Sequence, residues 1–347
     1  MEARTPLPLS FQIKHIGDFL NTLPALGFMK SHFPGHSAGI VVTPKLAELA
    51  AAHPWVDQVF ILDRSLGLSH LRRLAVEIRR HDYRTGLIFD GQTRSIVTAF
   101  LAGLDRRLGA SGLYPIKGWE RWLYSSDLRI AENGSKSSFF SQAEKGLRLA
   151  AAALGIEAEK GYRPPMPILS AANTARAEEL LGGISGEGPL IGLTLQGLQP
   201  EKSWPLASFA ALVKHLRREL GARLFVTGGP DESPAARSLA RVSGVPLADF
   251  CGLTGLLDLV ALADKSDLFI TIDTGTSHLV ALTATPLVSI FIWTSPVLWP
   301  PQSSQTRILC YDWALARFGL PANGPWRSAP VVTPEMVFEE AMALLGR

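Results

Sequence analysis

The chain alternates between short apolar runs and longer segments of helical period. In the first half, the runs LSFQI, AGIVVT, QVFIL and TGLIFD are separated by LNTLPALGFMKSHF, PKLAELAAAH and LSHLRRLAVEIRR. The runs are nearly continuous in apolar residues, which is typical of parallel strands with helices on both faces. We therefore predict an α/β domain, Rossmann-like, with a doubly wound parallel sheet.

The same alternation starts again after a proline-rich stretch, KGYRPPMPILS. The runs LIGLTL, ARLFVTGG and DLFITI predict the strands of a second α/β domain, with a helix from about Trp204 after the first of them. We expect an N-terminal domain over residues 1–165 and a C-terminal domain over 166–330. Residues 331–347 read as a last helix, with Thr333 as its cap and Pro334 in its first turn.

Composition excludes several classes of protein. The 347 residues are 47% hydrophobic and carry a formal net charge of +3, so we expect a folded protein with no need of a nucleic-acid partner. Two cysteines, Cys251 and Cys310, are too few for a disulfide framework or a zinc ligand set. No stretch approaches the roughly 18 apolar residues of a membrane span. We expect a cytoplasmic protein.

Polar and glycine-containing clusters follow five of the predicted strands: HIGD, DGQTRS, TLQGLQPEKSWP, TGGPDES and DTGTSH. In open parallel sheets, ligands bind at the carboxyl ends of the strands. Each cluster alone also fits an ordinary connecting loop. Their shared location is what predicts a ligand site, and we expect it in a cleft between the two domains.

The cluster DTGTSH has the composition of an anion site. Asp273 ends a buried strand, Gly275 permits close backbone approach, and Thr276 or Ser277 can cap a helix whose first N–H groups face a diphosphate. The alternative is an ordinary capped turn, with His278 satisfied by a neighbour inside the helix.

Two further clusters suit other parts of a nucleotide. Lys202 is a point charge suited to phosphate oxygens, and the alternative is a solvated surface lysine. Gly228 and Gly229 let the backbone approach a ligand, while Glu232 is placed to accept hydrogen bonds from ribose hydroxyls. Glu232 could equally be a first-turn acid that the helix dipole stabilises.

Several common enzyme motifs are missing from the sequence. There is no Gly-x-Gly-x-x-Gly after the first strand, no P-loop, no Gly-x-Ser-x-Gly and no His-Glu-x-x-His. These gaps argue against dinucleotide oxidoreductases, P-loop NTPases, serine hydrolases and zincins. There is also no Asp-x-Asp pair of the kind that bridges a metal to a sugar diphosphate, so we expect a metal-independent mechanism.

Five segments resemble the bacterial heptosyltransferases of glycosyltransferase family nine, in matching order over almost the whole chain. They are KHIGDFLNTLPALGFMKSHFPG, VDQVFILD, KSWPLASFAALVKHL, LFVTGGPDE and DTGTSHLVALTATPLVSIF. The resemblance implies the two-domain GT-B fold, with a last helix that crosses back to the N-terminal domain. It also implies metal-independent, inverting transfer of heptose from ADP-heptose to the lipopolysaccharide core.

The resemblance also assigns roles to residues. It implies that Asp18 is the general base, that Glu232 binds the ribose, and that the diphosphate lies against Lys202, Asp273, Thr274, Gly275 and His278. A sugar hydroxyl is a poor nucleophile, so a carboxylate must take its proton during attack.

Residues around Asp18 and in DGQTRS are candidates for binding the acceptor. Gly17 would allow a tight turn that presents the Asp18 carboxylate, although Asp18 could instead only cap the following helix. Lys14, His15 and Arg94 are the candidates for holding anions of the acceptor, and a solvated basic surface is the alternative for Arg94.

Some segments depart from the family pattern. FIWTSP has Ile292 and Trp293 where many relatives carry Gly-Pro, and the loop LTLQGLQPEKSWP lacks their usual lead-in. Two alternatives therefore stay open: transfer of another nucleotide sugar to O-antigen, capsule or protein, and a sugar-nucleotide-binding protein without transfer activity. The partners we expect are a nucleotide-sugar donor as co-substrate, a lipopolysaccharide core or related glycan acceptor, and the inner membrane through peripheral contact on its cytoplasmic face. We expect no cofactor and no nucleic acid.

Overall fold

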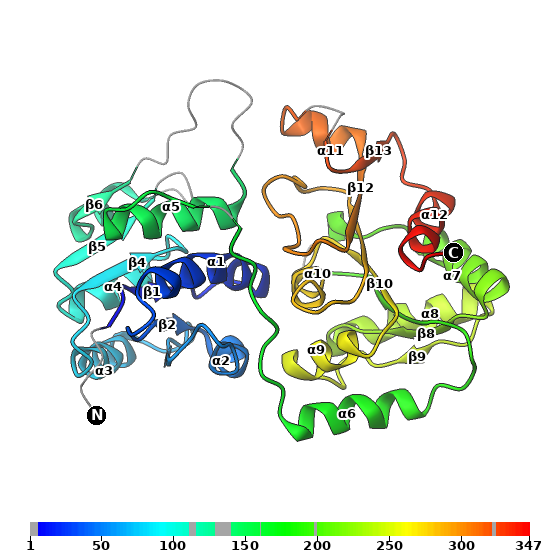
Figure 1. Ribbon diagram of the computed structural model, residues 1–347, viewed down its shortest axis with the longest axis horizontal. Helices are drawn as coiled ribbons and strands as arrows, with labels where there is room; N and C mark the ends of the chain where they lie inside the picture. Colours follow the sequence, from blue (N-terminus) through cyan, green and yellow to red (C-terminus); the bar gives the residue numbers. More distant parts are fainter. Residues whose placement is uncertain (1–5, 111–115, 129–139, 160, 198–199, 321–323) are drawn as a thin grey trace. The chain divides into compact units, whose positions relative to one another are not determined.

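The computed structural model describes residues 6–110, 116–128, 140–159, 161–197, 200–320 and 324–347. The chain divides into two compact units, residues 1–168 and 169–347 (Figure 1). Each unit contains one parallel β-sheet, so the predicted α/β class with two parallel sheets is confirmed. The division falls within the proline-rich stretch, at which the sequence analysis expects one domain to end.

The first unit has a six-stranded sheet of order β3-β2-β1-β4-β5-β6. Its strands are β1 Leu9–Phe11, β2 Gly39–Val42, β3 Gln58–Ile61, β4 Thr85–Ile88, β5 Arg106–Gly109 and β6 Ser126–Asp127. Its helices are α1 Ile16–His32, α2 Pro44–Ala51, α3 Leu68–Arg79, α4 Thr93–Leu101, α5 Gln142–Leu154 and the 3₁₀ helix η1 Gly118–Leu123. Helix α1 packs against α5, whereas α3 packs against α4, and α4 against η1.

The second unit has a seven-stranded sheet of order β13-β12-β11-β10-β7-β8-β9. Its strands are β7 Leu190–Thr194, β8 Arg223–Val226, β9 Ala248–Asp249, β10 Leu268–Ile272, β11 Leu287–Phe291, β12 Thr306–Tyr311 and β13 Arg327–Ala329. Its helices are α6 Ala171–Gly182, α7 Leu206–Leu220, α8 Ser233–Ser243, α9 Leu256–Asp264, α10 Gly275–Val280, α11 Asp312–Arg317 and α12 Pro334–Leu344. Two short 3₁₀ helices, η2 Pro200–Lys202 and η3 Pro230–Glu232, follow β7 and β8.

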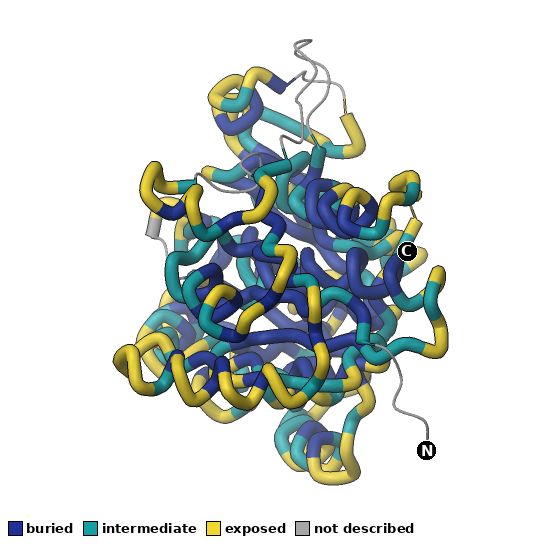
Figure 2. Tube along the Cα trace, turned by 90° about the vertical axis from the view of Figure 1, so that its left-hand side faces the viewer, coloured by how far each residue is buried: buried dark blue, intermediate teal, exposed yellow. Residues whose placement is uncertain are grey.

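The central strands are buried along their whole length, which explains why their sequences do not alternate. Every residue of β1, β2, β7, β10 and β11 is buried. Figure 2 shows buried residues in the interior and exposed residues on the outer helical turns. Each sheet thus buries apolar side chains on both faces, as parallel sheets covered by helices do.

Helix α12 packs on the second unit. Thr333 is its N-cap and accepts a hydrogen bond from the Met336 N–H at 3.4 Å, as predicted. The buried residues Val337 and Ala341 belong to the same apolar core as β7 and β10. Within its own unit the helix contacts α7 and β11. Its expected crossing to the first unit stays a prediction.

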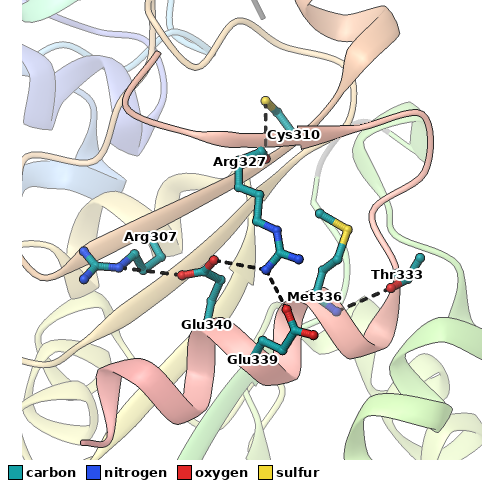
Figure 3. Close-up of polar contacts among 7 residues, drawn as sticks. All are labelled: Arg307, Cys310, Arg327, Thr333, Met336, Glu339 and Glu340. Atoms are coloured by element: carbon teal, nitrogen blue, oxygen red, sulfur yellow. Dashed lines mark hydrogen bonds and ion pairs between the residues drawn. The ribbon is translucent and has the colours of Figure 1, made fainter. Parts of the chain in front are cut away.

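Ion pairs also hold α12 against the edge of the second sheet (Figure 3). The Arg327 guanidinium of β13 lies 2.8 Å from the Glu339 carboxylate and 3.4 Å from that of Glu340. Arg307 of β12 lies 3.7 Å from Glu340. Both arginines are about half exposed, so the apolar contacts contribute more to the docking of α12 than these pairs do.

Within the described ranges, each helix is too short or too polar to cross a bilayer.

Candidate functional site

The first unit reverses its strand order between β1 and β4. From β1 the chain moves to β2 and β3 on one side, and it returns to place β4 on the other side of β1. The loops that leave β1 and β4 therefore diverge at the carboxyl ends of these strands, which is the usual ligand position in such sheets. HIGD and DGQTRS both lie here.

Asp90 joins these two loops. It follows β4 and is completely buried, and its carboxylate accepts hydrogen bonds from the Ile13 N–H at 2.9 Å, the Gln92 N–H at 2.8 Å and the Ser95 hydroxyl at 2.7 Å. Burial raises the pKa of Asp90 to about 6, although these three hydrogen bonds favour its charged form. Asp90 therefore fixes the loop after β1 against the first turn of α4.

Asp18 lies inside α1, not in a loop before it. The helix begins at Ile16, with His15 as N-cap, and the Asp18 carboxylate accepts a hydrogen bond from the His15 N–H at 3.3 Å. Gly17 is a helical residue and is not among the glycines with positive φ, so the expected tight turn at this glycine is wrong. The side chain of Asp18 is 9% exposed, and it occupies the third position of the helix, which suits a capping carboxylate.

Lys14 lies near both carboxylates. Burial lowers the pKa of Lys14, while the negative charges of Asp18 and Asp90 act in the opposite direction. His15 is exposed at the start of α1. One lysine, one histidine and two carboxylates thus meet at the reversal point of the first sheet.

Arg94 is half-buried in the first turn of α4. Its guanidinium donates a hydrogen bond to the Leu66 carbonyl at 2.5 Å, so it braces the loop between β3 and α3. This contact gives Arg94 a structural role beside the predicted role in acceptor binding.

The second unit reverses its strand order between β7 and β10. Lys202, from the loop after β7, lies 2.9 Å from the carboxylate of Asp273, which follows β10. The same carboxylate accepts a hydrogen bond from the Thr294 hydroxyl, which follows β11. The side chain of Asp273 is only 5% exposed and that of Lys202 is 21% exposed, so the pair is partly removed from water. The structure therefore places these three loops together, as the predicted phosphate site requires.

Helix α10 starts directly beside this pair. Its N-cap is Thr274, so the sequence-based choice of Thr276 or Ser277 as cap is wrong; the Ser277 hydroxyl instead donates to the Thr274 carbonyl at 2.7 Å. Gly275 and Thr276 occupy the first two helical positions, where backbone N–H groups have no partner within the helix. His278 is 4% exposed, within the helix.

Gly197 explains how the loop after β7 can approach α10. A Cβ at Gly197 would lie 2.7 Å from Thr274 Cγ2, closer than side-chain atoms normally come. Only glycine fits at this position without a shift of Thr274.

Glu232 lies one strand further along the sheet, at the end of η3. Its carboxylate accepts a hydrogen bond from the Gly229 N–H at 2.9 Å, and burial raises its pKa. A Cβ at Gly228 would lie 2.6 Å from the Glu232 carboxyl carbon, whereas one at Gly229 would lie 3.7 Å from the nearest oxygen. Gly228 therefore makes room for the carboxylate, and Gly229 holds it through the backbone.

Sequence reasoning missed two residues of these sites. Asp90 stands in DGQTRS directly after a buried strand, which is the position that Asp273 occupies in the second unit, and this shared position could have identified it. Thr294 stands in FIWTSP, directly after the apolar residues Ile292 and Trp293. Nothing in its local sequence indicates that it contacts Asp273.

Comparison with known proteins identifies the family of the chain. Residues 71–319 match glycosyltransferase family 9 (heptosyltransferase). Lipopolysaccharide heptosyltransferase 2 of Salmonella typhimurium is 25% identical over 347 residues, which cover 95% of this chain and 96% of that protein.

Two solved structures share the fold. The ADP-heptose lipopolysaccharide heptosyltransferase II of Escherichia coli superposes with a TM-score of 0.76 at 20% identity, over 98% of both chains. A family 9 glycosyltransferase from Veillonella parvula gives a TM-score of 0.81 at 19% identity, over 99% of this chain and 98% of that one. The fold is therefore GT-B-like. Because the family match covers more than two thirds of the residues, the chain belongs to glycosyltransferase family 9 and is a heptosyltransferase-like glycosyltransferase.

Proposed function

We propose that this enzyme transfers heptose from ADP-heptose to a lipopolysaccharide core acceptor, with inversion at the anomeric carbon and without a metal ion. The observation that carries the donor half of this proposal is the contact between Lys202 and Asp273 at the strand reversal of the second unit. The family and the Salmonella relative, named for heptosyl transfer to lipopolysaccharide, support the choice of sugar and acceptor.

On the donor side, Lys202 and the first N–H groups of α10 would bind the diphosphate. Lys202 already forms a charged hydrogen bond, so its ammonium can turn from Asp273 to a phosphate oxygen without a new loop conformation. Asp273 would then orient the lysine, and His278 would support the helix from inside. Glu232, presented by Gly228 and Gly229, would accept hydrogen bonds from the ribose hydroxyls.

On the acceptor side, Asp18 would act as the general base. The acceptor hydroxyl attacks the anomeric carbon, the bond from that carbon to the diphosphate oxygen breaks, ADP leaves, and the hydroxyl proton passes to the Asp18 carboxylate. Lys202 stabilises the charge that develops on the leaving diphosphate. Asp90 is a poor candidate for the base because it is completely buried and already accepts three hydrogen bonds.

Lys14, His15 and Arg94 would bind anionic groups of the acceptor. Lys14 lies close to the proposed base, since the charges of Asp18 and Asp90 both act on it. A phosphorylated core sugar would satisfy these cations.

A transfer assay with purified protein tests this proposal. ADP-heptose is incubated with a heptose-deficient lipopolysaccharide core, and ADP release and product mass are measured; other nucleotide sugars and glycan acceptors run in parallel. Transfer from ADP-heptose, with none from the other nucleotide sugars, supports the proposal. Transfer from a different nucleotide sugar would overturn the donor and keep the enzyme class, and binding of a nucleotide sugar without transfer to any acceptor would indicate a protein that has lost catalysis.

A further inference from the structure

Two exposed tryptophans lie together where strands of the second sheet end. Trp293 follows β11, and Trp313 lies in the first turn of α11, directly after β12; these two strands are parallel neighbours. The ring centroids of the tryptophans lie 5.3 Å apart, and the ring planes are inclined by 63°. Trp293 remains 37% exposed and Trp313 39%. Large aromatic side chains that stay open to water often mark a binding site.

Arg317 adds a cation to this aromatic pair. It is the last residue of α11, and its guanidinium carbon lies 4.0 Å from the centroid of the Trp293 ring. This cation–π contact fixes the guanidinium beside the indole. Arg317 is exposed, and within the described residues its N–H groups have no hydrogen-bond or ion-pair partner. Up to five N–H donors are therefore available to a ligand next to the tryptophans.

The aromatic pair adjoins the proposed phosphate site. The residue after Trp293 is Thr294, whose hydroxyl donates a hydrogen bond to the Asp273 carboxylate. Lys202 contacts the same carboxylate from the loop after β7. In the sheet order, β11 and β12 lie on one side of β10, whereas β7 and β8 lie on the other, and the proposed ribose-binding residue Glu232 follows β8. A diphosphate bound by Lys202 would thus lie between Glu232 and the tryptophans, so the group on its far phosphate would extend toward Trp293.

The chemistry of this cluster suits a sugar ring. The C–H groups of a sugar form an apolar patch that packs on the electron-rich face of an aromatic ring, whereas its hydroxyls need polar partners. Here the tryptophans provide the aromatic surface and Arg317 provides the hydrogen-bond donors. A nucleobase would also stack on tryptophan, but in the proposed donor orientation the base lies on the β8 side, beyond Glu232.

We propose that Trp293, Trp313 and Arg317 bind the sugar of the nucleotide-sugar donor and determine which sugars this enzyme accepts. The tryptophans contact the C–H face of the sugar, and Arg317 donates hydrogen bonds to its hydroxyls. This inference rests on the donor half of the proposed function. FIWTSP departs from the family pattern at Trp293, so a sugar site of this kind is particular to this chain.

Calorimetric titration of the full chain with ADP and with ADP-heptose tests the proposal, because only the second ligand carries a sugar on the diphosphate. We expect Trp293→Ala to lower the affinity for ADP-heptose roughly tenfold and the affinity for ADP by no more than about twofold. Arg317→Gln should lower the affinity for ADP-heptose about fivefold, again with little effect on ADP. Trp293→Phe keeps an aromatic face and should stay within about threefold of the parent for both ligands.

Trp122→Ala is the matched control. It removes a tryptophan of η1 in the first unit that is 89% exposed, and both affinities should keep their parental values. Melting curves show that each variant is folded. Saturation-transfer NMR detects the contact directly: protons of the bound sugar should receive saturation from the parent protein and lose most of it in Trp293→Ala, whereas the adenine protons keep theirs.

Two results would overturn the proposal. Equal losses of affinity for ADP and ADP-heptose in Trp293→Ala would place the tryptophans against the nucleobase. Parental affinities for both ligands would leave the cluster with a structural role or, if KM for the lipopolysaccharide core rises, with a role in acceptor binding.

The donor named in the proposed function can fail separately. If the parent transfers a sugar other than heptose, the same comparison is made between that nucleotide sugar and its nucleoside diphosphate, with the same expected and contrary results. A parent that binds no nucleotide sugar would overturn both the proposed function and the sugar site.

Discussion

The two strand reversals of this molecule place an aspartate at the same topological position and use it differently. In the first unit, Asp90 receives three hydrogen bonds from its own and the neighbouring loop and is completely buried. In the second unit, the Asp273 carboxylate accepts hydrogen bonds from the Lys202 ammonium and the Thr294 hydroxyl. Asp90 thus holds two loops together, and in the proposed function the general base of that unit is Asp18. In the proposed donor site, Asp273 instead orients the Lys202 ammonium for the diphosphate.

The largest expected effect tests whether Asp18, and not Asp90, supplies the base in the first unit. Asp18→Asn keeps an oxygen that can accept the His15 N–H but cannot take a proton, so turnover should fall by roughly 10²–10⁴-fold while donor affinity stays the same. Single-turnover transfer and calorimetric titration with ADP measure the two quantities. Near-parental turnover would reduce Asp18 to a helix cap, since asparagine caps nearly as well as aspartate.

A pH titration of stability tests whether the Asp90 carboxylate is buried as the structure shows. Its ordinary pKa of 3.8 rises to about 6 in the folded protein, so the folded state binds this proton more tightly than the unfolded state. The stability from this group is complete below about pH 4 and is lost as the pH rises through 6, an effect on the order of 3 kcal/mol. Urea-unfolding curves between pH 4 and 7 should show this decline in the parent and not in Asp90→Asn.

The control for this titration is Asp105→Asn. Asp105 is 65% exposed and lies 3.6 Å from Arg84, so its removal should leave the pH dependence of the parent unchanged. A decline that persists in Asp90→Asn would assign it to another group and remove the contrast with Asp273.

The next prediction tests whether Lys202 of the second unit binds the nucleotide. Lys202→Ala should weaken binding of ADP and of the nucleotide sugar alike by about 1.5–3 kcal/mol, as expected for a charged hydrogen bond. Calorimetry measures both ligands. Lys214→Ala, an exposed lysine of α7, is the matched control and should bind like the parent. Equal affinities for all three proteins would make the contact between Lys202 and Asp273 purely structural.

The smallest effect compares two adjacent glycines. In Gly228→Ala the new methyl group must displace the Glu232 carboxylate, which it would approach to 2.6 Å, and donor affinity should fall about tenfold through the lost ribose contact. Gly229→Ala meets only an ordinary contact at 3.7 Å and should change affinity little. Similar affinities for both variants would remove Glu232 from the proposed ribose site.

The predictable part of this fold is the part that repeats a simple pattern. The buried strands β1, β2, β7 and β10 follow from unbroken apolar runs, and the cap of α12 follows from Thr333 and Pro334. Contacts between loops that are distant in the sequence could not be predicted from local patterns. The pair of Lys202 and Asp273 is separated by 71 residues and depends on the strand order of the second sheet, which local sequence does not contain.

The error at Gly17 has a local cause. Gly17 suggested a turn because glycine favours turns, but it also fits a first helical turn, and the capping interaction between His15 and Asp18 outweighs its low helix propensity.

The indole of Trp204 has a consequence for how the chain can be shortened. Its N–H donates to the Val332 carbonyl at 3.1 Å, and its ring packs edge-on against Phe209, so the segment that carries Lys202 is tied to the residue before the cap of α12. Removal of residues 332–347 would leave a buried indole N–H without its acceptor. It would also loosen the loop that carries Lys202, the residue proposed to bind phosphate. A deletion at the C-terminus would therefore lower the affinity for the donor, although the deleted residues lie far from the donor site in the sequence.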